Sequence, residues 1–121
     1  ILRNVSEKLP QDIVSIIQHT HENDILNQIV SGQLDADRMD YLLRDSYFTA
    51  TSYGQFDLER ILRTMRVRKT AEGRKVIVVK YTGIHSVEDY IMARYQMYWQ
   101  VYYHPVARSY EAVFIQLFQR G

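Results

Sequence analysis

The segment DADRMDYLLRD, residues 35–45, gathers four aspartates and two arginines into eleven positions. We placed it on a helical wheel at about 100° per residue. One sector contains Asp37, Tyr41, Arg44, Asp45 and Phe48, and the apolar side chains Met39, Leu42 and Leu43 lie opposite. Two carboxylates, a guanidinium and a phenol can therefore converge on one site, while the other face of the same helix packs in a core.

A solvated surface explains the same pattern. Asp40 and Arg44 are four residues apart, and such an exposed ion pair contributes only a few tenths of a kcal/mol to helix stability. The rings of Tyr41 and Phe48 favour a partly enclosed cleft instead, because they lie among the charges rather than on the apolar face. The wheel alone leaves both interpretations open.

A second candidate stretch has Arg94, Tyr98 and Tyr102 at intervals of four residues. The guanidinium of an arginine is a fixed-charge fork that suits a phosphate or a carboxylate. Core packing is the ordinary explanation of an aromatic stripe at helical spacing. However, phenols need hydrogen-bond partners when they are buried, and this stripe also contains an arginine.

Helices must position these residues. Asp35 is a suitable N-cap for a helix over about 36–48, and the longest helix is expected from about His85 to Tyr103, with Pro105 breaking or kinking it. The 3.6-residue period also predicts helices over about 11–20, within NDILNQIVSGQ up to a stop at Gly32, over about 57–64 and after Pro105. MRVRK and KVIVVKY flank TAEGR, which indicates two strands and a turn. The sequence therefore predicts a mainly α fold with one small β-hairpin.

Composition limits the function classes. Fifteen basic and 14 acidic residues give a net charge of +1, and this balance argues against a nucleic-acid surface, which usually shows a basic excess. The absence of cysteine excludes disulfides and thiolate metal sites. No apolar run has the length of a membrane span and no signal peptide is evident, so we expect a cytoplasmic protein that does not contact a membrane.

The stretches SGQLDADRMDYLLRDSYFTATSYGQFDLERIL and EDYIMARYQMYWQVYYHP resemble the HD-domain metal-dependent phosphohydrolases. The likeness is to the bacterial members of their deoxynucleoside triphosphate triphosphohydrolase branch, and it covers essentially the whole chain. It implies that residues 1–64 are the C-terminal half of an HD domain. Residues 65–121 would supply the hairpin and long helices that complete the substrate pocket, in one compact unit.

The resemblance implies a hydrolase that converts deoxynucleoside triphosphates to deoxynucleosides and triphosphate. Asp37 would be the catalytic metal ligand, for Mn²⁺, Fe²⁺, Mg²⁺ or Zn²⁺. The metal would polarise a phosphate oxygen and activate a water for attack at the α-phosphorus. Substrate contacts are implied for Arg38 and Arg94 at the phosphates, Tyr41 and Asp45 at the sugar, Tyr102 under the deoxyribose and Tyr103 near the base.

The family's other metal ligands, a His and a His-Asp doublet, are missing before Asp37. His19 and His21 form only a His-x-His pair and are expected at the surface or in a cap, and His85 and His104 are expected to be structural. The chain also begins ILRNVSEKLP, without an initiator Met. We therefore expect a fragment of a longer protein that is inactive alone and holds no metal tightly.

Alternatives to the enzyme are a nucleotide-binding regulatory or degenerate HD protein without turnover, and a helical protein-interaction module. Family members assemble as homo-oligomers, and some bind an activating nucleotide between subunits. Asp57 and Arg60 match positions used there, although an exposed ion pair three residues apart explains them equally well. Ala50 stands where the bacterial relatives often have glycine, which affects only the expected loop conformation.

Overall fold

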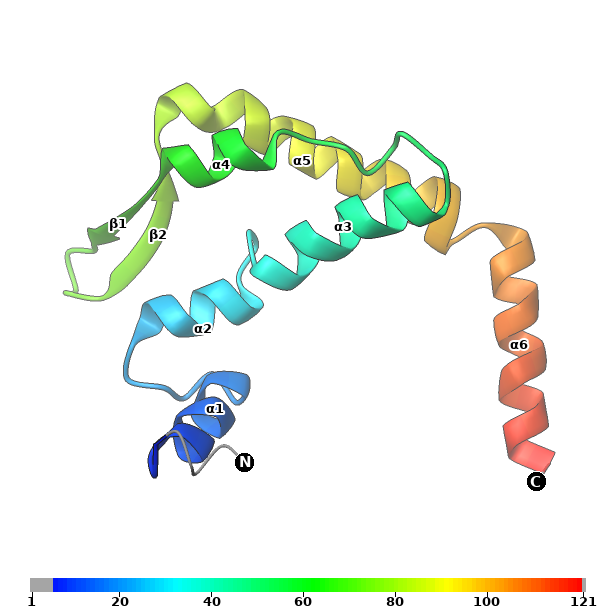
Figure 1. The fold of residues 1–121 in the computed structure, drawn as a ribbon, viewed down its shortest axis with the longest axis horizontal. Helices are drawn as coiled ribbons and strands as arrows, with labels where there is room; N and C mark the ends of the chain where they lie inside the picture. The colour runs from blue at the N-terminus through cyan, green and yellow to red at the C-terminus, as the bar shows by residue number, and fades with distance from the viewer. Residues whose placement is uncertain (1–5, 121) are drawn as a thin grey trace.

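The computed structural model describes residues 6–120, and within them the chain is mainly helical with one hairpin, as the sequence predicts. The elements in chain order are α1 (Leu9–Ile17), α2 (Asp24–Ser31), α3 (Ala36–Phe48), α4 (Leu58–Thr64), β1 (Met65–Lys69), β2 (Lys75–Val79), a 3₁₀ turn (Tyr81–Gly83), α5 (Ile84–Met97), a π-helical segment (Tyr98–Tyr102) and α6 (Pro105–Arg120). They form an open arch in which α3 and α5 lie side by side at the centre (Figure 1). The hairpin lies at one end of the arch, and α6 projects from the other.

Two aspartates fix where α3 and α4 begin. The Asp35 carboxylate accepts the backbone N–H of Arg38 at 2.7 Å, and the Asp57 carboxylate accepts that of Arg60 at 2.9 Å. Each bond satisfies one of the N–H groups that a helix leaves without a partner in its first turn. The predicted start of the site helix after Asp35 is therefore confirmed.

The hairpin is antiparallel and is anchored to α2. Its register pairs Met65 with Val79 and Val67 with Ile77, and Gly73 takes the positive φ of 82° that the turn needs. The side-chain amide of Gln28 donates to the Lys75 carbonyl at 2.9 Å and accepts the Ile77 N–H at 3.0 Å. These bonds satisfy two backbone groups on the outer edge of β2, which would otherwise be open.

The core joins α3, α4 and α5. Its buried apolar side chains are Met39, Leu42, Ile61, Tyr90 and Met97. They come from both sides of residue 64, where the sequence analysis divided the chain, and that division stays a prediction. Gly54 packs against this core so closely that a Cβ there would lie 2.5 Å from the Leu42 carbonyl oxygen.

The long helix differs from its prediction. Regular α-helix ends at Met97, and the next turn is a π-helix in which the Tyr103 N–H bonds the Tyr98 carbonyl, five residues back, at 2.8 Å. The wider turn alters the regular four-residue stagger of the tyrosine stripe. Such segments are rare and are frequent at functional sites.

Within the described residues, no helix is long and apolar enough to cross a membrane.

Candidate functional site

The polar face of α3 meets the π-helical segment in a cluster of tyrosines. The Tyr102 hydroxyl donates to an Asp45 carboxylate oxygen at 2.7 Å. The Tyr102 ring meets the ring of Tyr41 edge-on at 6.1 Å between centroids and that of Tyr98 at 5.2 Å. Helix α3 and the π-helical segment are thus joined by a charge-assisted hydrogen bond, between residues 57 positions apart, and by edge-to-face ring contacts.

Arg94 lies on α5, one turn before this cluster. Its side chain is half-buried, and its guanidinium lies 5.7 Å from the centroid of the Tyr98 ring. Within residues 6–120, Arg94 forms no ion pair with a carboxylate. An unpaired guanidinium in a partly desolvated place has donors to offer to an anion.

Arg38 is held more firmly by the protein itself. Its Nε lies 3.4 Å from a carboxylate oxygen of Asp35, and its Nη1 donates to the Gly32 carbonyl at 3.3 Å. Asp35 is only 4 % exposed, so this guanidinium compensates a buried carboxylate. Arg38 therefore has a structural partner in addition to any ligand that it contacts.

Asp37 occupies the first turn of α3 with an exposed side chain. Among the described residues it takes part in no ion pair, and no group of three or more His, Cys, Asp or Glu side chains could hold a metal ion. A carboxylate is a suitable ligand for a divalent cation. The role of Asp37 as a metal ligand therefore stays a prediction.

The protonation of the tyrosines follows from their surroundings. Burial raises the pKa of Tyr41 to about 12, with a further increase from the neighbouring Tyr98 hydroxyl. Burial also raises the pKa of Tyr102, and its bond to Asp45 adds to the effect. The pKa of Tyr98 is lowered, chiefly because its hydroxyl accepts from Tyr41, while Arg94 acts in the same direction. Tyr41 and Tyr102 are therefore hydrogen-bond donors at neutral pH.

Tyr103 lies at the edge of the cluster and not within it. Its ring is tilted against that of Tyr98 at 5.6 Å, and the Arg108 guanidinium of α6 lies 4.5 Å from its centroid. Tyr98 was not predicted as a site residue, yet its ring contacts those of Tyr102 and Tyr103 and lies near the Arg94 guanidinium. Its place in the Arg94–Tyr102 stripe was the sequence signal that pointed to it.

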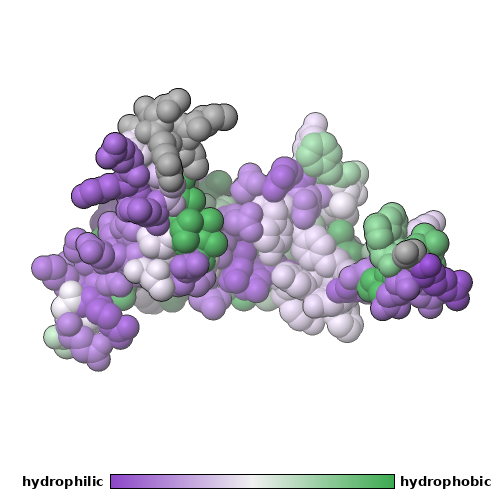
Figure 2. Space-filling view, turned by 90° about the horizontal axis from the view of Figure 1, so that it is seen from below, coloured by the Kyte–Doolittle hydropathy of each residue, from purple (hydrophilic) through white to green (hydrophobic). Residues whose placement is uncertain are grey.

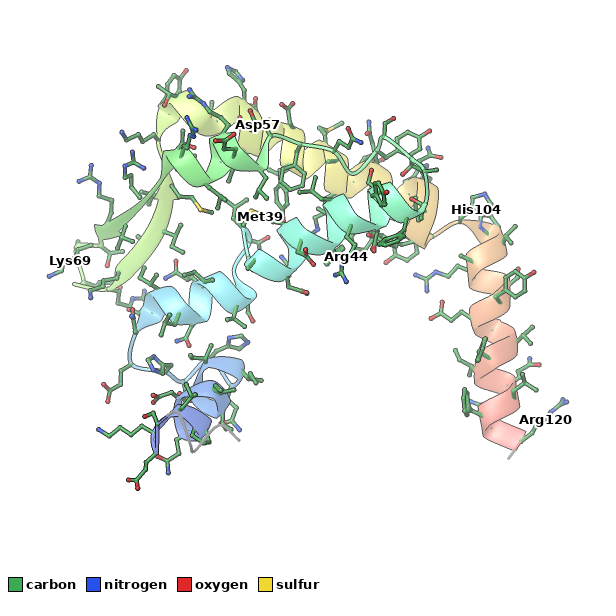
Figure 3. The ribbon with its side chains drawn as sticks, viewed as in Figure 1. Met39, Arg44, Asp57, Lys69, His104 and Arg120 are labelled. Atoms are coloured by element: carbon green, nitrogen blue, oxygen red, sulfur yellow. The ribbon has the colours of Figure 1, made fainter. Side chains whose placement is uncertain are left out.

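Two members of the predicted polar sector do not join the cluster. Phe48 is 77 % exposed and packs only edge-on with Tyr47, so the expectation that it encloses a cleft is wrong. Arg44 projects from α3 away from α5 (Figure 3) and pairs with Asp40 at 2.8 Å. The sector is therefore divided, because α5 covers only the part that contains Tyr41 and Asp45.

The ion pair suggested for Asp57 and Arg60 is absent from the described structure. Asp57 accepts the backbone N–H of Arg60, and the Arg60 guanidinium donates to the Thr82 carbonyl at 3.0 Å. The simple explanation of these residues as an exposed ion pair is therefore wrong. They instead fix the start of α4 and its contact with the 3₁₀ turn.

The other residues singled out from sequence have local roles. His85 is exposed and contacts Glu88, and His104 accepts the Val106 N–H at 3.3 Å. His21 accepts the Asn23 N–H at 3.0 Å, as a cap residue would. Ala50 has a positive φ of 53°, a conformation that costs a non-glycine residue roughly 1–2 kcal/mol. That cost explains why glycine suits this position.

An apolar groove of about 470 Å³ lies between α2, α3, α4 and the hairpin. Its lining includes Ile25, Ile29, Leu62, Met65 and Ile77, and none of the residues predicted to bind substrate. Figure 2 shows a second apolar surface on α6, at the end of the arch. The groove lining is apolar apart from Arg66.

The comparisons with known proteins agree with this architecture. The uncharacterised protein YwfO of Bacillus subtilis is 53 % identical over 121 residues, which are all of this chain and 27 % of that protein. An uncharacterised protein of Methanocaldococcus jannaschii is 46 % identical over 93 residues, 77 % of this chain and 20 % of that protein. The chain thus spans about a quarter of the length of these curated relatives.

Solved structures show the same helices. A hypothetical protein from Aquifex aeolicus superposes with a TM-score of 0.81 at 35 % identity, covering 95 % of this chain and 31 % of that one. A phosphohydrolase from Bacteroides thetaiotaomicron superposes with a TM-score of 0.74 at 37 % identity, and the match covers 90 % of this chain and 26 % of that one. The family model described as the HD associated region matches residues 56–120, from the loop before α4 to the end of α6. The chain belongs to this family and is related to the HD-type phosphohydrolases.

Proposed function

We propose that this chain is the substrate-facing part of an HD-domain phosphohydrolase that hydrolyses deoxynucleoside triphosphates to deoxynucleosides and triphosphate. The observation that carries the proposal is the bond from Tyr102 to Asp45. It holds a wall of phenol rings beside a half-buried arginine that has no carboxylate partner among the described residues. A nucleotide site needs a flat surface against which the sugar and base can pack. It also needs an acceptor for the sugar hydroxyl and N–H donors for the phosphate oxygens.

The sugar would lie against Tyr102. Only one oxygen of Asp45 accepts the Tyr102 hydroxyl, so the other remains able to accept a hydroxyl of the ligand. Tyr41 stands beside it as a protonated phenol, because burial raises its pKa to about 12, and its oxygen can accept a hydrogen bond from the ligand. The face of a ring packed under the deoxyribose leaves no partner for a 2′-hydroxyl, which supports a preference for deoxynucleotides.

The phosphates would lie toward Arg94 and Arg38. Arg94 is the stronger of the two candidates, because Arg38 already compensates Asp35. Fixed guanidinium forks match the geometry of phosphate oxygens. Tyr103 is assigned to the base because its ring extends the aromatic wall beyond Tyr98.

Asp37 would contribute one oxygen ligand to a divalent metal. Its exposed carboxylate fits such a role, and the remaining ligands must come from outside the described residues. The metal, when bound, supplies Lewis-acid activation of a phosphate oxygen and of a water. Asp37 would help to hold that metal, and the other proposed site residues of this chain would orient the sugar and the phosphates.

Regulation and assembly are separate proposals. Asp57 lies at the start of α4 (Figure 3), where its carboxylate accepts the backbone N–H of Arg60. A second nucleotide would bind at these two residues, between subunits of a homo-oligomer. Arg60 would have to exchange its bond with the Thr82 carbonyl for a phosphate.

Replacing Asp37 in the full-length protein tests the proposed function. Asp37→Asn should abolish dNTP turnover and remove bound metal, because an amide is a poor ligand for a divalent cation. The matched control is Asp40→Asn on the same helix, where the aspartate pairs only with exposed Arg44. Turnover and metal content should stay at wild-type levels in the control. Equal metal content in the Asp37→Asn protein would contradict the assignment, and nucleotide binding by the wild type without turnover would identify a regulatory protein instead.

A further inference from the structure

Tyr98 lies between Arg94 and the other tyrosines of the π-helical segment. It is the first residue of the π-helical segment, and its ring contacts those of Tyr102 at 5.2 Å and Tyr103 at 5.6 Å. It also lies one helical turn after Arg94, whose guanidinium approaches its ring at 5.7 Å. No other tyrosine of the described chain is in contact with both the aromatic wall and this arginine.

The other arginines near α3 obtain their orientation from carboxylates. Arg38 pairs with Asp35 and Arg44 with Asp40. Arg94 has no such partner within the described residues, so its position depends on the Tyr98 ring and hydroxyl. An arginine side chain has roughly 2 kcal/mol of rotamer entropy to lose when it becomes ordered. A contact that orders it before the ligand arrives therefore improves ligand binding.

The hydrogen bonding of Tyr98 leaves one donor unused. The neighbouring Tyr41 hydroxyl and Arg94 guanidinium lower the pKa of Tyr98, and the guanidinium lies 5.7 Å from the centroid of its ring. A hydroxyl has two acceptor lone pairs and one hydrogen. Because the Tyr98 ring lies beside the Arg94 guanidinium, the hydroxyl hydrogen can be donated to an oxygen bound near Arg94.

We propose that Tyr98 positions Arg94 for the substrate phosphates and directs its own hydroxyl hydrogen to the same phosphate group. This inference rests on the proposed function, because the phosphate is that of the nucleotide. Tyr98 thereby joins the residues proposed to contact the substrate, and the π-helical turn places it there. The turn brings both Tyr102 and Tyr103 into contact with Tyr98 at the end of α5.

Inorganic triphosphate is the probe, and its affinity for the metal-loaded full-length protein is measured by calorimetry. Tyr98→Phe keeps the ring and removes the hydroxyl, and it should weaken triphosphate binding about three- to tenfold. Tyr98→Leu removes the ring as well, and it should weaken triphosphate binding further than Tyr98→Phe does. The matched control is Tyr95→Phe, one residue after Arg94 on the exposed side of α5, which should bind as the wild type does.

Steady-state kinetics with a dNTP give a second measurement. Tyr98→Phe should raise KM more than it lowers kcat, with a melting temperature close to that of the wild type. Unchanged triphosphate affinity in Tyr98→Phe would overturn the inference, and so would a loss of the folded state, which would make Tyr98 structural. If the wild type binds triphosphate through Tyr98 but turns over no dNTP, the proposed function fails and the role of Tyr98 stands.

Discussion

Replacing Tyr102 distinguishes sugar discrimination from packing. In the complete enzyme, Tyr102→Ala removes the ring that we place under the deoxyribose, and Tyr102→Phe removes only the hydroxyl that bonds Asp45. An unpaired buried hydroxyl costs roughly 1–3 kcal/mol, which corresponds to about one to two orders of magnitude in selectivity. The preference for dGTP over GTP should therefore fall about tenfold or more in Tyr102→Ala and should largely persist in Tyr102→Phe.

Stability, unlike the preference for dGTP, should fall in both variants, because both lose the hydroxyl. The bond from Tyr102 to the Asp45 carboxylate is charge-assisted and partly buried, so its loss should cost about 1.5 kcal/mol in Tyr102→Phe. Tyr102→Ala loses in addition two edge-to-face ring contacts, each contributing roughly 0.5–1.5 kcal/mol. The assay is kcat/KM for both nucleotides, with chemical denaturation alongside. An unaltered dGTP-to-GTP ratio in Tyr102→Ala, whatever its stability, would refute the placement of the ring.

Three further predictions concern pH, phosphate binding and packing. Because the folded-state pKa of Tyr102 is raised, its stabilisation is complete below the unfolded-state pKa of about 10 and is lost as pH rises further. The stability difference between wild type and Tyr102→Phe should accordingly be constant from pH 7 to 9 and shrink above 10, and a constant difference up to pH 12 would contradict this. Arg94→Lys should raise KM about tenfold with a melting temperature within a few degrees of the wild type, because a lysine lacks the guanidinium fork. Gly54→Ala should destabilise the protein by about 1–3 kcal/mol in urea unfolding, since the nearest obstacle is the Leu42 backbone carbonyl.

Local signals in the sequence were sufficient for most helix boundaries. Asp35 and Asp57 are N-caps whose effect acts within three residues, so they predict the starts of α3 and α4 without knowledge of the fold. The hairpin was likewise visible, because a change to two-residue alternation around Gly73 is a local pattern. Such features depend on neighbours in the chain and not on tertiary contacts.

The site was only partly predictable for the same reason. The wheel grouped Phe48 with Tyr41, but only the arrangement of α5 decides which part of that sector is covered. The Tyr102–Asp45 bond joins residues 57 positions apart, so no local pattern indicates it. The π-helical turn after Met97 was also missed, because the regular four-residue spacing of Arg94, Tyr98 and Tyr102 is typical of an α-helix.

The chemical outcome of hydrolysis tests the central proposal most directly. The full-length protein is incubated with a dNTP and a divalent metal in ¹⁸O-labelled water, and the products are identified by ³¹P NMR and mass spectrometry. Attack at the α-phosphorus predicts an unlabelled deoxynucleoside and a triphosphate that carries one ¹⁸O atom. Release of pyrophosphate or orthophosphate, or no turnover with any dNTP, would contradict the proposal.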